Sequence, residues 1–182
     1  MAPTLLTPRL VLHAWIDDDT EAWADMNADP RVMEFFPSTD LRERSLQSAQ
    51  VLRSNLDRDG CGWWVVEVKG CMPFAGVIAL QPVPFEAPFT PANEIGWRFC
   101  ADAWGMGYAT ESALAALKFA FEKLKWPEVV AMTASINLRS RRVMERIGMT
   151  HDSRDDFDHP RLESGHRLQR HVLYRAKVGP AE

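Results

Sequence analysis

The sequence has no long apolar run, no excess of basic charge and few cysteines, and each shortage excludes a class of protein. No stretch reaches the roughly 20 apolar residues that a membrane-spanning helix needs, and the first dozen residues lack the pattern of a secretory leader. The formal net charge is -4, so the chain has no general basic field that would hold a nucleic-acid backbone. We therefore expect a cytoplasmic protein with neither a membrane nor a nucleic acid as partner.

The cysteines and histidines do not form a metal-binding pattern. Cys61, Cys71 and Cys100 are odd in number and lack C-x-x-C spacing, which argues against a disulfide framework and against a zinc site. Four of the five histidines lie in the last quarter of the chain, without a supporting carboxylate at ligand spacing. We expect reduced thiols, isolated surface or hydrogen-bonded histidines, and no metal.

The length and the pattern of elements predict one domain over residues 1–182, since the chain fits one ordinary core and shows neither an internal repeat nor a linker. Period-two and β-branched runs predict strands, which are expected at residues 10–14, 63–68, 75–80, 94–100, 129–135 and 171–178. Amphipathic runs predict helices after 17–19, before Gly60, and at residues 108–125 and 137–147. We expect the three aspartates at 17–19 to offer caps for the first helix, and residues 33–37 to form an apolar loop. Ser38 or Thr39 is expected to cap the second helix, which has Leu41 among its apolar positions. The fold class is α+β, with a central twisted mixed sheet.

Two glycines stand between the expected strand at 94–100 and the helix that follows it. The segment reads Trp104, Gly105, Met106, Gly107, Tyr108 and Ala109. The first amides of a helix lack partners within the helix and its dipole is positive there, so an anion is favoured at this place. Glycine lets the backbone approach a bulky anion, although a tight turn that needs glycine for itself would give the same pattern. The spacing matches neither a Walker loop nor the Rossmann fingerprint.

A second motif follows downstream, where Asn137 and Ser140 begin an arginine-rich helix. Together the two motifs resemble the GNAT acetyltransferases, and more closely the branch of Rim-type ribosomal-protein N-terminal acetyltransferases and their relatives. In that superfamily the phosphate turn reads Q/R-x-x-G-x-G/A, and Trp104 departs from it at the first position, as is common in this branch. The resemblance covers most of the chain. It runs from Thr7, Pro8, Arg9 and Leu10 through Tyr108, Ala109, Thr110 and Glu111 to Leu173 and Tyr174.

The resemblance implies a splayed pair of strands, near 94–100 and 129–135, with the pantetheine arm of acetyl-CoA between them. Amides near Phe99 and Cys100 would pair with the pantetheine, and one of them would hold the thioester oxygen. The pyrophosphate would lie on the turn, at Gly105, Met106, Gly107, Tyr108, Ala109 and Thr110. Asn137 would hydrogen-bond the cofactor near the thioester. One of Arg139, Arg141, Arg142 or Arg146 would reach the nucleotide phosphate, unless these arginines form a solvated helix face.

Acetyl transfer needs a neutral amine, stabilisation of charge on the thioester oxygen, and a proton for the departing thiolate. Glu94 stands where several family members carry a general-base carboxylate, with a solvated strand end as the alternative. Many relatives place a tyrosine at the position of Met144, and a thioether has no proton to give. Ser140, one helical turn earlier, is the expected proton donor, with capping or packing as the alternative. A thiol such as Cys100 in an apolar strand behaves as a small hydrophobe, so we expect direct transfer in a ternary complex.

The expected acceptor is an amine, either a protein N-terminus or a small molecule such as an amino sugar, a polyamine or an amino-acid derivative. Aromatic residues near the acceptor side and the acidic-aromatic segment at 155–159 would suit a cationic amine. Two other functions stay open. One is a CoA-binding sensor or partner-binding module without turnover, which Met144 favours, and the other, ranked far lower, is nucleic-acid binding through the arginines at 139–146. The sequence does not decide between a monomer and a homodimer.

Overall fold

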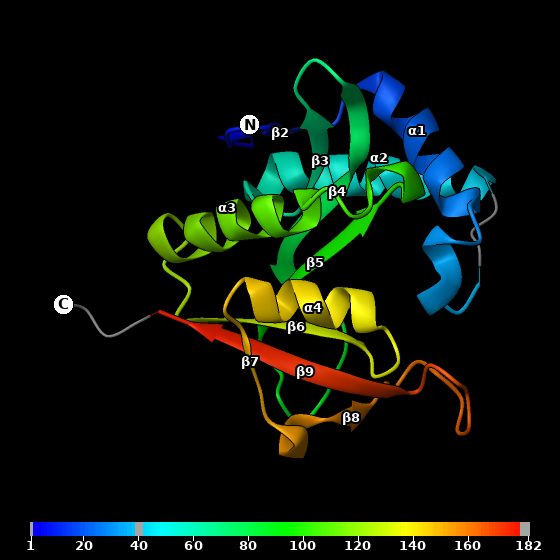
Figure 1. The fold of residues 1–182 in the computed structure, drawn as a ribbon, viewed down its shortest axis with the longest axis vertical. Coiled ribbons are helices and arrows are strands. Elements are labelled where there is room, and N and C mark those ends of the chain that lie inside the picture. The colour runs from blue at the N-terminus through cyan, green and yellow to red at the C-terminus, as the bar shows by residue number, and fades with distance from the viewer. Residues whose placement is uncertain (1, 39–41, 179–182) are drawn as a thin grey trace.

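The computed structural model describes residues 2–38 and 42–178, which form a mixed sheet with helices on both faces (Figure 1). The strands lie in the order β1-β2-β3-β4-β5-β6-β9-β7, and β8 pairs with β9. They are β1 (Leu5–Leu6), β2 (Leu10–His13), β3 (Trp63–Val68), β4 (Met72–Pro82), β5 (Asn93–Phe99), β6 (Glu128–Ala134), β7 (Thr150–His151), β8 (Phe157–Asp158) and β9 (Arg170–Lys177). The predicted α+β class with a central mixed sheet is confirmed.

The described residues contain α1 (Asp17–Ala28), α2 (Arg42–Asp59), α3 (Tyr108–Glu122) and α4 (Leu138–Arg146), with the short 3-10 turns η1 (Val32–Phe35), η2 (Ala101–Ala103) and η3 (Ser153–Asp155). Two neighbouring tryptophans of β3 show how the helices are divided. Trp63 packs edge-on against Trp23 of α1, and Trp64 packs edge-on against Phe119 of α3. Because successive strand residues point to opposite faces, α1 and α2 cover one face, and α3 and α4 lie next to each other on the other (Figure 1). In this part of the chain, no helix has the length and apolarity needed to cross a membrane.

Some element boundaries differ from the sequence-based expectations, because individual side-chain contacts set them and the hydrophobic pattern does not show these contacts. The cap position of α1 is Ile16, whose amide donates to Asp19 Oδ2 at 2.8 Å, so the expected aspartate cap is wrong and Asp19 acts from inside the helix. The expected loop at 33–37 begins as the turn η1. The expected cap at Thr39 and the apolar position at Leu41 lie outside the described residues. The two-residue strands β1, β7 and β8 are too short for a periodic pattern and were not predicted.

The predicted splay of two parallel strands is present. β5 and β6 pair only where Glu94 lies opposite Val130, near the start of both strands. Farther along, β6 continues to pair with β9 up to Ala134 opposite His171, and β5 continues to pair with β4 up to Phe99 opposite Gly76. The C-terminal halves of β5 and β6 therefore diverge and leave a gap between them.

Candidate functional site

A cavity of about 770 Å³ opens at this divergence, a volume within the range of about 300 to 1,000 Å³ usual for small-molecule sites. Its walls come from the ends of β5 and β6, the glycine turn, α4, η1 and the segment between β8 and β9. Five arginines and two histidines line it, and no aspartate or glutamate of the described residues does. They are Arg98, Arg139, Arg142, Arg146, Arg161, His159 and His171. The arrangement suits a ligand that carries several negative charges.

The glycine turn forms the wall at the N-terminus of α3. Gly105 and Gly107 have φ values of 77° and 80°, in the left-handed region that only glycine adopts readily, and α3 begins directly after Gly107. Five of the six residues predicted to hold the pyrophosphate line the cavity, namely Gly105, Gly107, Tyr108, Ala109 and Thr110. Met106 is not among the lining residues, and it is 54% exposed. The positive end of the α3 dipole therefore borders the cavity.

A clamp from the N-terminal segment holds this turn, and no pattern in the sequence predicts it. Glu111 accepts hydrogen bonds from Thr7 Oγ1 at 2.6 Å, from the Arg9 amide at 2.9 Å and from Arg9 Nε at 2.6 Å. Arg9 Nη1 in turn donates to the carbonyl oxygen of Met106 at 2.9 Å, and its guanidinium lies 4.9 Å from the ring centre of Tyr108. The clamp thus joins the first segment of the sequence resemblance to the start of α3.

Of the two amides predicted to pair with the pantetheine, those of Phe99 and Cys100, only one points toward the gap between β5 and β6. The Cys100 amide donates to the carbonyl oxygen of Ala75 in β4 at 2.9 Å, so its predicted pairing with a pantetheine is corrected. In an antiparallel ladder the amides of successive residues point to opposite sides, and the Phe99 amide therefore points toward the gap. Burial raises the pKa of the Cys100 thiol to about 11, which leaves it protonated and unreactive at neutral pH.

Asn137 and Ser140 lie together on the opposite wall. Asn137 caps α4 by accepting a hydrogen bond from the Ser140 amide at 3.2 Å. Its side-chain nitrogen donates to Ser140 Oγ at 3.0 Å and to Thr133 Oγ1 at 2.9 Å, so both of its donors are engaged within the protein. Asn137, Ser140, Thr133 and the buried Met144 all line the cavity. Because Ser140 Oγ accepts from Asn137, its own proton is left to be donated.

The four arginines of α4 have different surroundings. Arg141 is turned toward β9, where its Nε donates to the hydroxyl of Tyr174 at 3.4 Å, and its Nη1 donates to the carbonyl oxygen of Ser135, after β6, at 3.1 Å. It does not line the cavity. Arg139 lies 4.3 Å from the ring centre of Trp104 and pairs with Glu34 at 2.5 Å. Arg142 and Arg146 line the cavity without an ion pair among the described residues. These two are the arginines of α4 best placed for an anionic ligand.

Glu94 lies at the point where β5 and β6 separate, but it is not among the residues that line the cavity. Gln81 Nε2 donates to its Oε1 at 2.7 Å, and Gln81 Oε1 accepts from the indole of Trp63 at 2.6 Å. Burial raises the pKa of Glu94, against the hydrogen bond from Gln81 and the charge of Arg161. The carboxylate is thus held in a low-polarity place beside the cavity, and it is not a solvated strand end.

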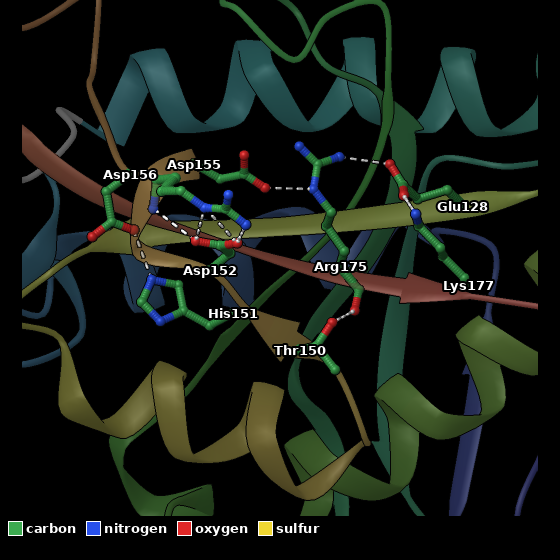
Figure 2. A network of polar contacts seen from close by, with 9 residues as sticks. Glu128, Thr150, His151, Asp152, Asp155, Asp156, Arg175 and Lys177 are labelled. Atoms are coloured by element: carbon green, nitrogen blue, oxygen red, sulfur yellow. Dashed lines mark hydrogen bonds and ion pairs between the residues drawn. The ribbon is translucent and has the colours of Figure 1, made fainter.

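The acidic-aromatic segment at 155–159 does not present its carboxylates to the cavity, so the expectation of an acidic acceptor side is wrong. Arg175 donates to Asp155 at 2.8 Å and to Glu128 at 2.7 Å, and His151 pairs with Asp156 at 2.7 Å (Figure 2). Asp158 points toward Arg170 on β9 at 3.4 Å. These carboxylates are engaged in ion pairs and do not line the cavity.

The histidines include hydrogen-bonded rings, as expected, and one pair of rings that the sequence did not predict. His151 is paired with Asp156, whereas His159 and His171 lie side by side with ring centres 4.8 Å apart and both line the cavity. Their separation in the sequence gives no periodic signal. Within the described residues no group of three metal-ligating side chains occurs.

Comparison with known proteins bears on this site. A family model described as "Acetyltransferase (GNAT) domain" matches residues 9–150. The chain is 31% identical over 201 residues to the FsC-acetyl coenzyme A-N(2)-transacetylase of Aspergillus fumigatus, with 98% of this chain and 85% of that protein covered. It is 29% identical over 146 residues to the uncharacterized protein YkkB of Bacillus subtilis, with 80% and 84% covered.

Solved structures share the fold. An acetyltransferase from Agrobacterium tumefaciens matches with a TM-score of 0.76 at 27% identity, over 98% of this chain and 96% of that one. A RimL ribosomal-protein N-acetyltransferase in complex with coenzyme A matches with a TM-score of 0.77 over 97% and 98% of the chains. Its identity of 15% makes this a likeness of fold alone.

Proposed function

Because the chain belongs to the GNAT acetyltransferase family and transfers an acetyl group from acetyl-CoA to an amine, we propose that its two substrates meet in the cavity between β5 and β6. The observation that carries this proposal is the shared cavity of the glycine turn, the diverging strands and the Asn137–Ser140 pair. The three are distant in sequence, and one elongated ligand with an anionic end and a thioester end would contact all of them.

Acetyl-CoA binds with its pyrophosphate on the amides of residues 105–110, where the α3 dipole is positive. Arg142 and Arg146 supply charge for the remaining phosphate. The pantetheine follows the gap and pairs with the amide of Phe99, while Asn137 acts indirectly by orienting Ser140 and Thr133.

The transfer is direct. The amine nitrogen forms a bond to the acetyl carbon, the carbon–sulfur bond breaks, and the thiolate takes the hydroxyl proton of Ser140, which then recovers a proton from water. Glu94 accepts the proton of the amine through a water molecule, since its carboxylate lies beside the cavity. Its raised pKa makes it a stronger base than a solvated carboxylate.

The acceptor is a protein N-terminus or a small-molecule amine. The names of the relatives do not decide between these two acceptor classes. RimL is named for acetylation of a ribosomal protein, and the fungal enzyme is named for transfer to an N(2) position. We place the whole chain, residues 1–182, in one catalytic domain, and its location in the cytoplasm stays a prediction.

Release of free thiol from acetyl-CoA in the presence of amines and peptides with varied first residues tests the function. Ser140→Ala should lower kcat by roughly 10- to 100-fold, at the low end of general-acid effects because water can substitute in part. The dissociation constant of acetyl-CoA should barely change. Ser140→Cys, which keeps a proton donor at the same place, should retain more activity than Ser140→Ala. If Ser140→Ala matches the wild type while chemistry is rate-limiting, the Ser140 hydroxyl serves only to pack against Asn137 and the thiolate is protonated by water.

A further inference from the structure

His159 and His171 form a polar pair in the cavity wall, on the side of β6 and β9. His171 belongs to β9 and lies opposite Ala134, at the open end of β6, and His159 follows β8. Phe85, at 4.7 Å from His159 between ring centres, and Phe157, at 5.7 Å from His171, hold the two rings from behind. The pair is therefore fixed in position by aromatic packing.

The hydrogen bonds of the two rings assign their tautomers. His171 Nδ1 lies 3.1 Å from the carbonyl oxygen of Gln169, and a carbonyl only accepts, so Nδ1 carries the proton and Nε2 the lone pair. His159 Nδ1 accepts from the amide of Arg161 at 3.2 Å, so in the neutral ring the proton is on Nε2. One ring thus has an acceptor at Nε2 and the other has a donor.

Both rings are neutral near pH 7. Burial, the neighbouring His171 and the charge of Arg161 lower the pKa of His159 to about 4. Burial also lowers the pKa of His171, against its contacts with the backbone of Gln169 and Leu168. The donor and acceptor assignments therefore hold near pH 7.

We propose that this pair selects an acceptor whose amine stands next to a carbonyl group. The amine donates an N–H to His171 Nε2, and the carbonyl oxygen accepts from His159 Nε2. This inference rests on the proposed function, which puts the acceptor in the same cavity. A protein N-terminus and an amino-acid amide share the aminoacyl group and both belong to this class.

The charges of the cavity agree with this class and disfavour a polycationic amine. No carboxylate of the described residues lines the cavity, and the aspartates of the neighbouring segment pair with Arg175, His151 and Arg170. A polyamine would bring additional positive charges into a cavity lined by five arginines. It would find no carboxylate of the described residues there with which to form an ion pair.

Alaninamide and its analogue with an isopropyl group in place of the carboxamide are nearly isosteric and test the inference. Both have the same branched carbon bearing the amine, and only alaninamide carries the carbonyl. Thiol release is measured for both with the wild-type enzyme, with kcat/KM expressed per concentration of neutral amine. We expect alaninamide to be favoured on the order of 10- to 100-fold, the cost of leaving a buried donor unpaired. A short peptide that begins with alanine distinguishes the protein source from the small-molecule source.

Substitutions at the histidines test whether His159 causes the preference for alaninamide. His159→Asn keeps an acceptor for the Arg161 amide but loses the distant N–H, so the preference for alaninamide should fall toward unity. His159→Gln places an amide N–H near the former Nε2 and should keep most of it. His166→Asn is the matched control, because His166 Nδ1 accepts from the amide of Leu168 at 3.1 Å in the same way and His166 does not line the cavity. This variant should leave the preference unchanged.

Three results overturn the inference. Equal kcat/KM values for the two amines in the wild type would overturn it while leaving acetyl transfer intact. A preference that persists in His159→Asn would show that another group recognises the carbonyl. If acetyl-CoA binds but no amine in the panel releases thiol, the proposed function fails as well, and this outcome is distinct from transfer without preference.

Discussion

Gly107→Ala separates the cost of backbone strain from the loss of a ligand contact. The φ of Gly107 is 80°, and a Cβ at this position would lie 3.4 Å from Arg9 Nη2, the one described atom beyond its chain neighbours within 4 Å. The fold can therefore accept a methyl group there at the cost of strain alone. A pyrophosphate that lies on the turn would meet the same methyl group.

The magnitudes follow from general values. An alanine in the left-handed region costs roughly 1–2 kcal/mol, and each kcal/mol lowers the Tm of a domain of this size by about 2–4 °C. A hydrogen bond from an amide to a charged group is worth about 1.5–3 kcal/mol, so losing one should raise the Kd for acetyl-CoA roughly 10- to 100-fold.

Gly148→Ala is the matched control, since Gly148 has the same φ of 80°, no atom within 4 Å of a built Cβ, and no place in the cavity wall. Thermal unfolding without ligand should show similar losses of Tm for both variants. Titration with acetyl-CoA should show weaker binding only for Gly107→Ala. If both variants bind acetyl-CoA as tightly as the wild type, the phosphates do not lie on this turn.

Two further predictions concern carboxylates. Glu94→Gln should lower kcat more than it changes KM for acetyl-CoA, and the acidic limb of the pH–rate profile should shift or disappear; an unchanged profile would make Glu94 a structural residue. Burial raises the pKa of Glu111, but the hydrogen bonds from Thr7 and Arg9 outweigh it and lower that pKa below its ordinary 4.5. Glu111→Gln should therefore be less stable than the wild type above pH 4.5, and the difference should vanish as the pH falls through the lower folded value; a difference in Tm that is constant in acid would contradict this reasoning.

The parts of the site that the sequence predicted are those made within a few residues. The glycine turn needs only two left-handed positions before a helix, and α4 lies within the range that its amphipathic pattern predicts. Such local chemistry leaves a pattern in the sequence. The clamp between Arg9 and Glu111 leaves none, because it joins residues that are 102 positions apart.

The Cys100 amide shows the same limit within a strand that was correctly predicted. Whether an amide points toward one neighbouring strand or the other depends on the pairing register, and here Gly76 lies opposite Phe99. A shift of one residue would exchange the roles of the Phe99 and Cys100 amides. Sequence reasoning located the strand but had no access to that register.

The wrong expectation for the segment at 155–159 has a consequence for the chemistry. In β8 the side chains alternate, so Phe157 is buried and Asp158 is exposed, and the acidic character of the segment lies outside the cavity. On the proposed placement, the acceptor amine then enters a cavity lined with arginines. Nearby positive charge disfavours the ammonium form and lowers the pKa of a bound amine. The cavity that attracts the phosphates of acetyl-CoA thus also favours the neutral nucleophile, which reduces the basicity required of Glu94.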